Sequence, residues 1–383
     1  MNLERSLVLN RFLDSLLAAS GFDELRSSLR EQEEGPDAEG HSRFYRVLDG
    51  RSGLRVDHDR LRDYDLRIME YEAELAKNRR SEPFRAWKYF QYLPLLYAEI
   101  LLDRLTEDPE RLLRELNAFV ARQPHSVGIA AFEADDLRRM AFFMATGSGK
   151  TLLLHVNIRQ VLHYLRFGSH PEALVRRADG RREFDNILLI TPGEGLSEQH
   201  LAELEDSGVN AGRLERWGGG RSGFEPRVLV TENSKLTEGP AGEGVSIPIT
   251  ELGDRNLVIV DEGHKGTGSE ARTWKSRQEA LSRNGFLLEY SATFEQAIGA
   301  ASRRIQEELL STYGKSIVFD YSYRYFYQDG HGKAFRVLNL KRADAERAHD
   351  LMVGGLLVFY QQVRLHAENQ AAAREYNIEK PLW

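Results

Sequence analysis

The sequence predicts an α/β protein in which a mainly parallel sheet follows a helical region. Residues 140–155 combine an apolar run, a glycine-rich turn and a second apolar run at helical spacing. From Met140 onward short apolar strands alternate with helices, which is typical of a parallel sheet. Before that point helical spacing dominates. These patterns predict a helical accessory domain (1–130), an α/β domain (131–341) and a helical linker (342–383).

The first 130 residues contain several amphipathic or buried helices. Helices are expected over 1–30, where Gly21 stops the apolar spacing, over 57–79 and over 109–121, whereas 31–53 is expected to be a loop. Residues 83–105 carry too many apolar side chains for a surface helix. We expect one or two buried helices there, with Pro94 as a break or kink, and aromatic residues that form core rather than a platform for base stacking.

Composition excludes several classes of protein. The net charge of −7 argues against a uniformly basic coat for nucleic acid, although a local basic groove remains compatible with it. The absence of cysteine excludes disulfides, thiolate metal sites and cysteine nucleophiles. No apolar run approaches the roughly 20 residues that span a bilayer, and the N-terminus lacks the order of a signal peptide. We therefore expect a cytoplasmic protein without a membrane partner.

The turn after the first predicted strand has the composition of a phosphate-binding loop. It reads Thr146, Gly147, Ser148, Gly149, Lys150 and Thr151. The glycines let backbone N–H groups point at phosphate oxygens, and the following helix N-terminus adds positive potential. Lys150 is placed to reach the β- and γ-phosphates of ATP, and the Thr151 hydroxyl to hold Mg²⁺. The alternative is a purely structural glycine turn between a core strand and a core helix.

A second signal is the strand 256–260, which delivers two acids at its carboxyl end. Asp261 is predicted to hold the Mg²⁺ that bridges the β- and γ-phosphates, and Glu262 to orient and deprotonate the attacking water. His264 lies too far along to act on the same water, so we expect it to transmit the nucleotide state to a neighbouring segment. The alternative is a surface turn with two solvated acids, and the glycine loop earlier in the chain disfavours it.

A third, weaker signal follows the strand that begins near Gly285. Ser291 and Thr293 are hydroxyl residues at its end and are predicted to link the acidic strand to the γ-phosphate region, which couples hydrolysis to motion. Hydroxyls in such places usually just cap a turn, and that alternative stays open.

With these three motifs in order, the chain resembles superfamily 2 helicases and translocases. Residues 144–151 match motif I, with Met144 in place of the usual first glycine; 261–264 match the Asp-Glu-x-His box, and 291–293 match motif III. The resemblance implies a RecA-like P-loop NTPase domain and ATP with Mg²⁺ as cofactors. Within the superfamily the chain is most similar to the helicase subunit of type III restriction enzymes, over about residues 132–333.

The resemblance also implies residues that contact nucleic acid. Thr191 and Pro192, with Leu196 and Gln199, resemble the motif that touches the nucleic-acid backbone, and Thr231 with Lys235 stands where a further such motif is expected. The implied function is an ATP-dependent translocase on double-stranded DNA, working in restriction-modification or phage defence beside other subunits. Two alternatives stay open, namely an ATPase that remodels protein and an idle ATP-binding fragment.

The last part of the sequence departs from the family pattern. These motors carry arginine fingers on a second RecA-like domain, and no such motif follows Thr293. We therefore expect the first domain of a longer motor, with slow hydrolysis by this chain alone. Residues 317–319 are expected to form a strand, 321–327 an antiparallel strand with a packed tyrosine face, 334–340 its hairpin partner, and 343–372 a helix.

Overall fold

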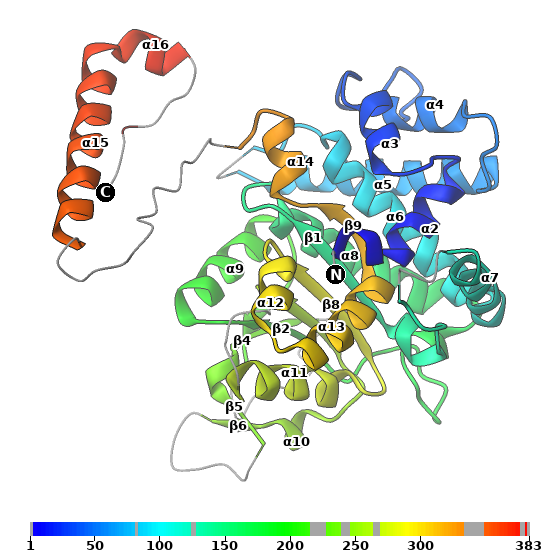
Figure 1. Ribbon diagram of the computed structural model, residues 1–383. Coiled ribbons are helices and arrows are strands. Elements are labelled where there is room, and N and C mark those ends of the chain that lie inside the picture. The colour runs from blue at the N-terminus through cyan, green and yellow to red at the C-terminus, as the bar shows by residue number, and fades with distance from the viewer. Residues whose placement is uncertain are drawn as a thin grey trace. The chain divides into compact units, whose positions relative to one another are not determined.

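The computed structural model describes residues 3–80, 83–123, 128–214, 227–238, 246–262, 269–332, 348–375 and 380 (Figure 1). They fall into two compact units, residues 1–332 and 333–383. The second unit contains helices α15 (Ala348–Glu368) and α16 (Gln370–Glu375), which confirms the predicted helix from residue 348 onward. The predicted hairpin partner at 334–340 lies outside the described residues. Within these ranges no helix combines the length and apolar composition needed to cross a bilayer.

The first unit is built on a parallel sheet of seven strands in the order β3-β4-β2-β7-β8-β1-β9. The predicted α/β class with a mainly parallel sheet is thereby confirmed. Five of the strands are buried along their whole length, as expected for parallel strands covered on both faces. The strands are β1 (Arg139–Met144), β2 (Ile187–Thr191), β3 (Ala211–Arg213), β4 (Val228–Glu232), β7 (Leu257–Asp261), β8 (Phe286–Ser291) and β9 (Ile317–Tyr321).

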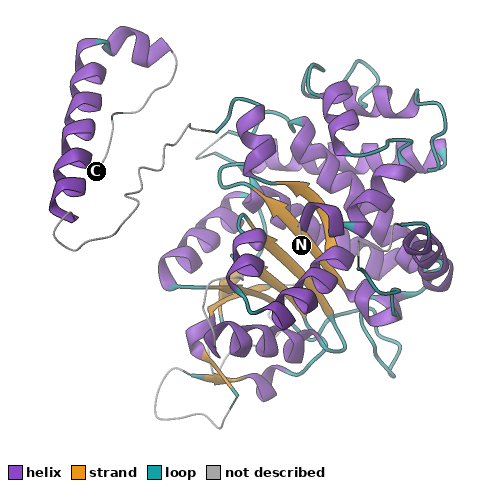
Figure 2. Ribbon diagram, in the orientation of Figure 1, coloured by secondary structure: helices purple, strands orange, loops and turns teal. Residues whose placement is uncertain are grey.

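Strand β1 shows how alternation of side chains assigns the two faces of the sheet. Phe142 and Met144 join the large core shared with the N-terminal helices, whereas Ala141 and Phe143 pack with Phe294 on the other side. Figure 2 shows the strands with helices on both faces. The helices that follow the first strand are α8 (Lys150–Phe167), α9 (Glu194–Asp206), α10 (Ile249–Leu252), α11 (Ser269–Ser282), α12 (Phe294–Ala300), α13 (Arg303–Ser316) and α14 (Tyr323–Gln328).

The N-terminal helices pack directly against the sheet. Residues 89–107 form one helix that is not broken at Pro94, where the sequence allowed a break or a kink. Its aromatic side chains belong to the core, as the sequence predicted. The helices and sheet share this core within one compact unit, so the domain boundary predicted at residue 130 stays a prediction. The helices are α1 (Leu3–Ser6), α2 (Val8–Leu16), α3 (Phe22–Leu29), α4 (Arg43–Asp49), α5 (His58–Asn78), α6 (Tyr89–Glu107) and α7 (Pro109–Ala121).

Four local predictions were wrong. The stretch 31–53 was expected to be a loop but contains helix α4, whose N-terminus is capped by the Ser42 hydroxyl. The glycine-rich stretch 208–226 and the stretch 237–254 also read as loops in the sequence. The first contains strand β3, and the second contains α10 and β6 (Ile247–Pro248), which pairs in parallel with β5 (Leu236–Thr237). The tyrosine-rich segment after β9 is helix α14 rather than an antiparallel strand.

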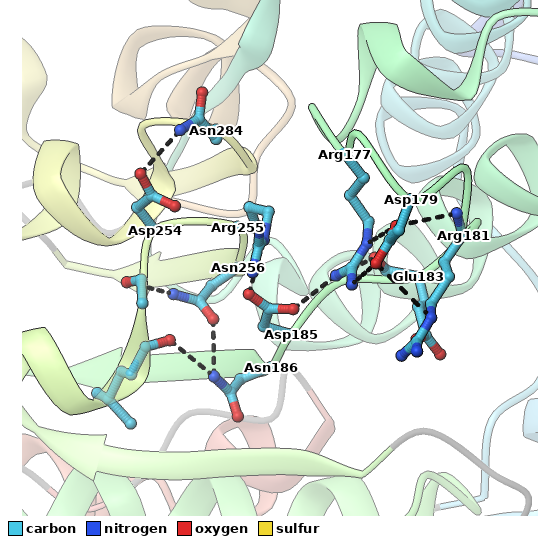
Figure 3. A network of polar contacts seen from close by, with 12 residues as sticks. Arg177, Asp179, Arg181, Glu183, Asp185, Asn186, Asp254, Arg255, Asn256 and Asn284 are labelled. Atoms are coloured by element: carbon cyan, nitrogen blue, oxygen red, sulfur yellow. Dashed lines mark hydrogen bonds and ion pairs between the residues drawn. The ribbon is translucent and has the colours of Figure 1, made fainter.

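Polar contacts connect the insertion after α8 to the turns that precede strands β2 and β7, at the amino edge of the sheet (Figure 3). Arg177 contacts Asp179 at 2.8 Å and Asp185 at 2.5 Å, and the Asp185 carboxylate also accepts a hydrogen bond from Arg255 at 2.9 Å. Asn186 donates to Asn256 at 2.8 Å, one residue before β7. These arginines serve the fold of the protein, because acids of the same chain neutralise them.

Candidate functional site

The glycine loop has the predicted strand–turn–helix geometry. Gly147 and Gly149 have φ values of +84° and +89°, in the left-handed region that favours glycine, and Gly149 caps helix α8. The Ser148 hydroxyl donates to the carbonyl of Ala145 at 2.7 Å and closes the turn, while the Ala145 N–H donates to Tyr321 of strand β9 at 2.9 Å. Thr146 and Gly147 are exposed, so this turn presents its backbone at the surface.

The loop lysine meets the second acid of the predicted pair. Lys150 Nζ lies 3.3 Å from Glu262 Oε1 and donates to the Met144 carbonyl at 3.3 Å. Both side chains are largely buried, with 11% and 19% of their surface exposed. Strand β8 separates β1 from β7 in the sheet, so the fold brings these groups together from two strands that do not pair with each other.

Glu262 itself adopts an unusual backbone conformation. Its φ is +56°, a region that costs about 1–2 kcal/mol for a residue with a side chain. Its N–H donates to the Tyr290 carbonyl at 2.9 Å, which fixes the turn at the end of β7 against β8. Backbone strain of this kind is concentrated at functional sites, where the surrounding structure holds it in place.

The Asp261 carboxylate fits the role of a ligand to Mg²⁺. Its Oδ2 contacts His200 Nε2 at 2.9 Å, whereas its Oδ1 is buried and has no hydrogen-bond partner in the described part of the chain. The described residues contain no group of three histidine or acidic side chains able to hold a metal by themselves. Mg²⁺ commonly needs only one or two carboxylates beside phosphate oxygens and water, so Asp261 with the Thr151 hydroxyl is a sufficient protein contribution.

The other predicted coupling residues lie at the same carboxyl edge of the sheet. Ser291 is the last residue of β8 and is fully buried, and its hydroxyl accepts a hydrogen bond from the Thr293 N–H at 3.0 Å. This is the turn-capping contact that the sequence left open, and the coupling role stays a prediction. His264 lies outside the described residues.

The predicted nucleic-acid residues divide into buried and accessible ones. Thr191 and Thr231 are buried, and the Thr191 hydroxyl lies 2.7 Å from the Ser197 hydroxyl at the start of α9. Gln199 is exposed and Pro192 half-buried, and Lys235 forms an ion pair with Glu232 at 2.5 Å. All five predicted residues lie beyond or at the carboxyl ends of β2 and β4. Their contact with nucleic acid stays a prediction.

Two residues of the site were missed by sequence reasoning. Gln91, in the first turn of α6, donates from Nε2 to the Ser148 carbonyl at 3.0 Å, and its Oε1 accepts from the Lys88 N–H at 3.1 Å. A glutamine three residues after a helix start is a capping signal, but nothing local connects it with a loop 57 residues away. His200, the contact of Asp261, stands 61 residues before its partner.

Together the parallel sheet, the glycine loop and the acidic pair at its carboxyl edge define a P-loop NTPase domain of the superfamily 2 helicase type. Residues 107–296 match the family described as "Type III restriction enzyme, res subunit". The resemblance stated from the motifs is thereby confirmed for this region of the chain.

The solved chain of "The crystal structure of T4 UvsW" is similar at 18% identity and a TM-score of 0.29. The alignment covers 49% of this chain and 32% of that one, so this protein spans about a third of the T4 UvsW chain. A search of curated proteins found no match.

Proposed function

We propose that the chain binds ATP with Mg²⁺ and hydrolyses it as part of a motor that moves on double-stranded DNA. The observation that carries the proposal is the meeting of Lys150 and Glu262 at 3.3 Å beside the unpaired Oδ1 of Asp261. A cation for the phosphates, a base for water and a metal ligand are the three groups that phosphoryl transfer to water requires.

The chemistry follows from the charges of these groups. The triphosphate oxygens compete with Glu262 for the Lys150 ammonium, so nucleotide binding frees the Glu262 carboxylate to orient a water molecule. Because Glu262 is held by the left-handed turn and by the Tyr290 carbonyl, its position changes little when this ion pair opens. Asp261 Oδ1 and Thr151 would hold Mg²⁺, which supplies charge stabilisation at the transferred phosphoryl group.

The nucleic-acid part of the proposal rests on the type III restriction resemblance and on the placement of Gln199 and Lys235 beyond the carboxyl ends of β2 and β4. A role in restriction or phage defence follows from the same resemblance. One observation favours the alternative of an ATPase that acts on protein. Glu232 neutralises both Lys235 and Arg213, at 2.5 and 3.0 Å, which reduces the positive charge available to a DNA backbone on this edge.

The test is ATP hydrolysis by the 383-residue chain with and without duplex DNA. Lys150→Ala should lose both nucleotide binding and hydrolysis, and Glu262→Gln should keep binding while hydrolysis falls about 10²- to 10⁴-fold. Lys275→Ala is the matched control, because it also removes a lysine whose ammonium group pairs with a carboxylate. Lys275, on helix α11, lies 3.0 Å from Glu308 on helix α13. Equal activity of all four proteins would refute the ATPase assignment.

Duplex DNA binding over a salt series distinguishes the two substrates. Phosphate contacts give an affinity that falls steeply with salt concentration, and a DNA motor should show this slope. Hydrolysis that ignores DNA, together with no measurable DNA binding at low salt, would favour the protein-directed alternative.

A further inference from the structure

The histidine next to the exposed Gln199 reaches into the nucleotide site from helix α9. His200 is 1% exposed, and its Nε2 lies 2.9 Å from Asp261 Oδ2. An ionised carboxylate only accepts hydrogen bonds, so the Nε2 of this imidazole carries the proton and donates. The contact engages one carboxylate oxygen, while the other, Oδ1, is buried and has no hydrogen-bond partner among the described residues.

The imidazole gains little else from its position. Its Nδ1 is buried and has no hydrogen-bond partner in the described ranges. A buried polar atom without a partner costs about 1–3 kcal/mol, so an apolar side chain of similar size would serve simple packing better. The contact with Asp261 is therefore what distinguishes a histidine from a leucine at this position.

Helix α9 is well placed to hold this side chain still. At its start the Ser197 hydroxyl pairs with Thr191 at 2.7 Å. At its end Arg79, from the turn after α5, donates to Glu203 at 2.8 Å and to the Ser207 hydroxyl at 3.1 Å. The helix is thus tied at both ends to β2 and to the N-terminal helices, and His200 lies between the two anchors.

We propose that His200 is a positioning residue that selects and orients the Asp261 oxygen presented to the Mg²⁺ of a bound nucleotide. This inference rests on the proposed function and deepens it, because it assigns the alignment of the metal ligand to α9. The same helix carries Gln199 on its exposed side, so a displacement of α9 at the surface reaches the metal ligand through one hydrogen bond. Partners that orient ligating carboxylates typically change metal affinity 10- to 100-fold when they are removed.

The test measures nucleotide binding, not turnover, in the full chain. A fluorescent, slowly hydrolysed ATP analogue is titrated in EDTA and then over a Mg²⁺ series. His200→Leu fills a similar space without a donor and should raise the Mg²⁺ concentration for half-maximal effect about 10- to 100-fold, with affinity in EDTA within twofold of wild type. His200→Gln, whose amide N–H can donate to the same oxygen, should recover most of this loss.

The control is Leu204→Ala, which removes a buried side chain from the same helix without touching Asp261. It should lower thermal stability and leave the Mg²⁺ dependence unchanged. The inference is overturned if His200→Leu keeps the wild-type Mg²⁺ dependence, if His200→Gln is as impaired as His200→Leu, or if Leu204→Ala shifts it equally. Wild-type chain that binds no nucleotide in either condition would instead overturn the proposed function, and this inference with it.

Discussion

Replacing Gly149 with alanine should destabilise the protein through two separate effects. The backbone there has a φ of +89°, which costs about 1–2 kcal/mol for a residue with a Cβ atom. The new Cβ would also collide with the Gln91 amide, which donates to the Ser148 carbonyl at 3.0 Å. Loss of that hydrogen bond adds about 0.5–1.5 kcal/mol. The expected decrease in the free energy of unfolding is therefore about 1.5–3.5 kcal/mol.

Denaturant unfolding of four proteins separates the two effects. Gly149→Ala is compared in the wild-type and Gln91→Ala backgrounds, since without the glutamine amide only the backbone strain remains. The cost should then fall by about 0.5–1.5 kcal/mol. Gly195→Ala is the control, because nothing lies within 4 Å of the added Cβ and the position is inside helix α9.

The control substitution should be neutral or stabilising by up to about 1 kcal/mol, as alanine favours helix over glycine. The reasoning is refuted if Gly149→Ala costs no more than Gly195→Ala. It is also refuted if the cost is the same with and without Gln91, since the two residues would then be independent.

Three further predictions concern other positions. Burial raises the pKa of the Asp14 carboxyl to about 7, despite the hydrogen bond that it accepts from the Tyr97 hydroxyl. The unfolded chain releases this proton at about pH 4, so between about pH 4 and 7 only the folded state holds it. As pH rises through that window, the free energy of unfolding should fall by up to about 1.4 kcal/mol per pH unit, and less steeply for Asp14→Asn. Equal slopes for the two proteins in urea unfolding would contradict this. Glu262→Asn should be more stable than Glu262→Ala by about 0.5–1 kcal/mol, because asparagine tolerates the positive φ of this position. A lower melting temperature for Glu262→Asn than for Glu262→Ala would refute backbone strain at this residue. Tyr290→Phe removes the 2.7 Å hydrogen bond to Asn157 and should lower the free energy of unfolding by about 1–3 kcal/mol. ATP hydrolysis should be unchanged, and its loss would contradict a purely structural role of the Tyr290 hydroxyl.

Sequence reasoning succeeded where the signal is local. The glycine loop is one such case, because the strand, the turn and the helix N-terminus that form it are contiguous in residues 139–167. The acids that end β7 are another, since a buried strand and the residues after it determine their position. Such patterns specify the nucleotide site without knowledge of the strand order.

The misassigned tyrosine segment shows a limit of periodicity. Tyr321 and Tyr325 pack as a stacked pair with ring centres 6.4 Å apart, and Tyr323 and Tyr327 form a second, more exposed pair at 6.2 Å. A spacing of four residues fits one face of a strand and also one face of a helix. The sequence alone therefore fits both. In the helix, Tyr325 packs on Phe22, and its N–H and that of Phe326 donate to the Ser322 carbonyl.

Gln91 and His200 could not be found in this way for a different reason. Each acts on a partner roughly 60 residues distant, through a contact that exists only after α6 and α9 dock on the sheet. A single sequence carries no record of such docking. Their side chains look like an ordinary cap and an ordinary core residue until the tertiary contacts are known.

The contact between Gln91 and the glycine loop limits how this protein can be divided. A shortened chain beginning near residue 131 would lack the amide that holds the Ser148 carbonyl. It would also expose apolar side chains of β1 and α8, such as Phe142 and Leu153, that are now covered by the shared core. Recombination or protein engineering that moves the ATPase to a new partner would have to move helix α6 with it.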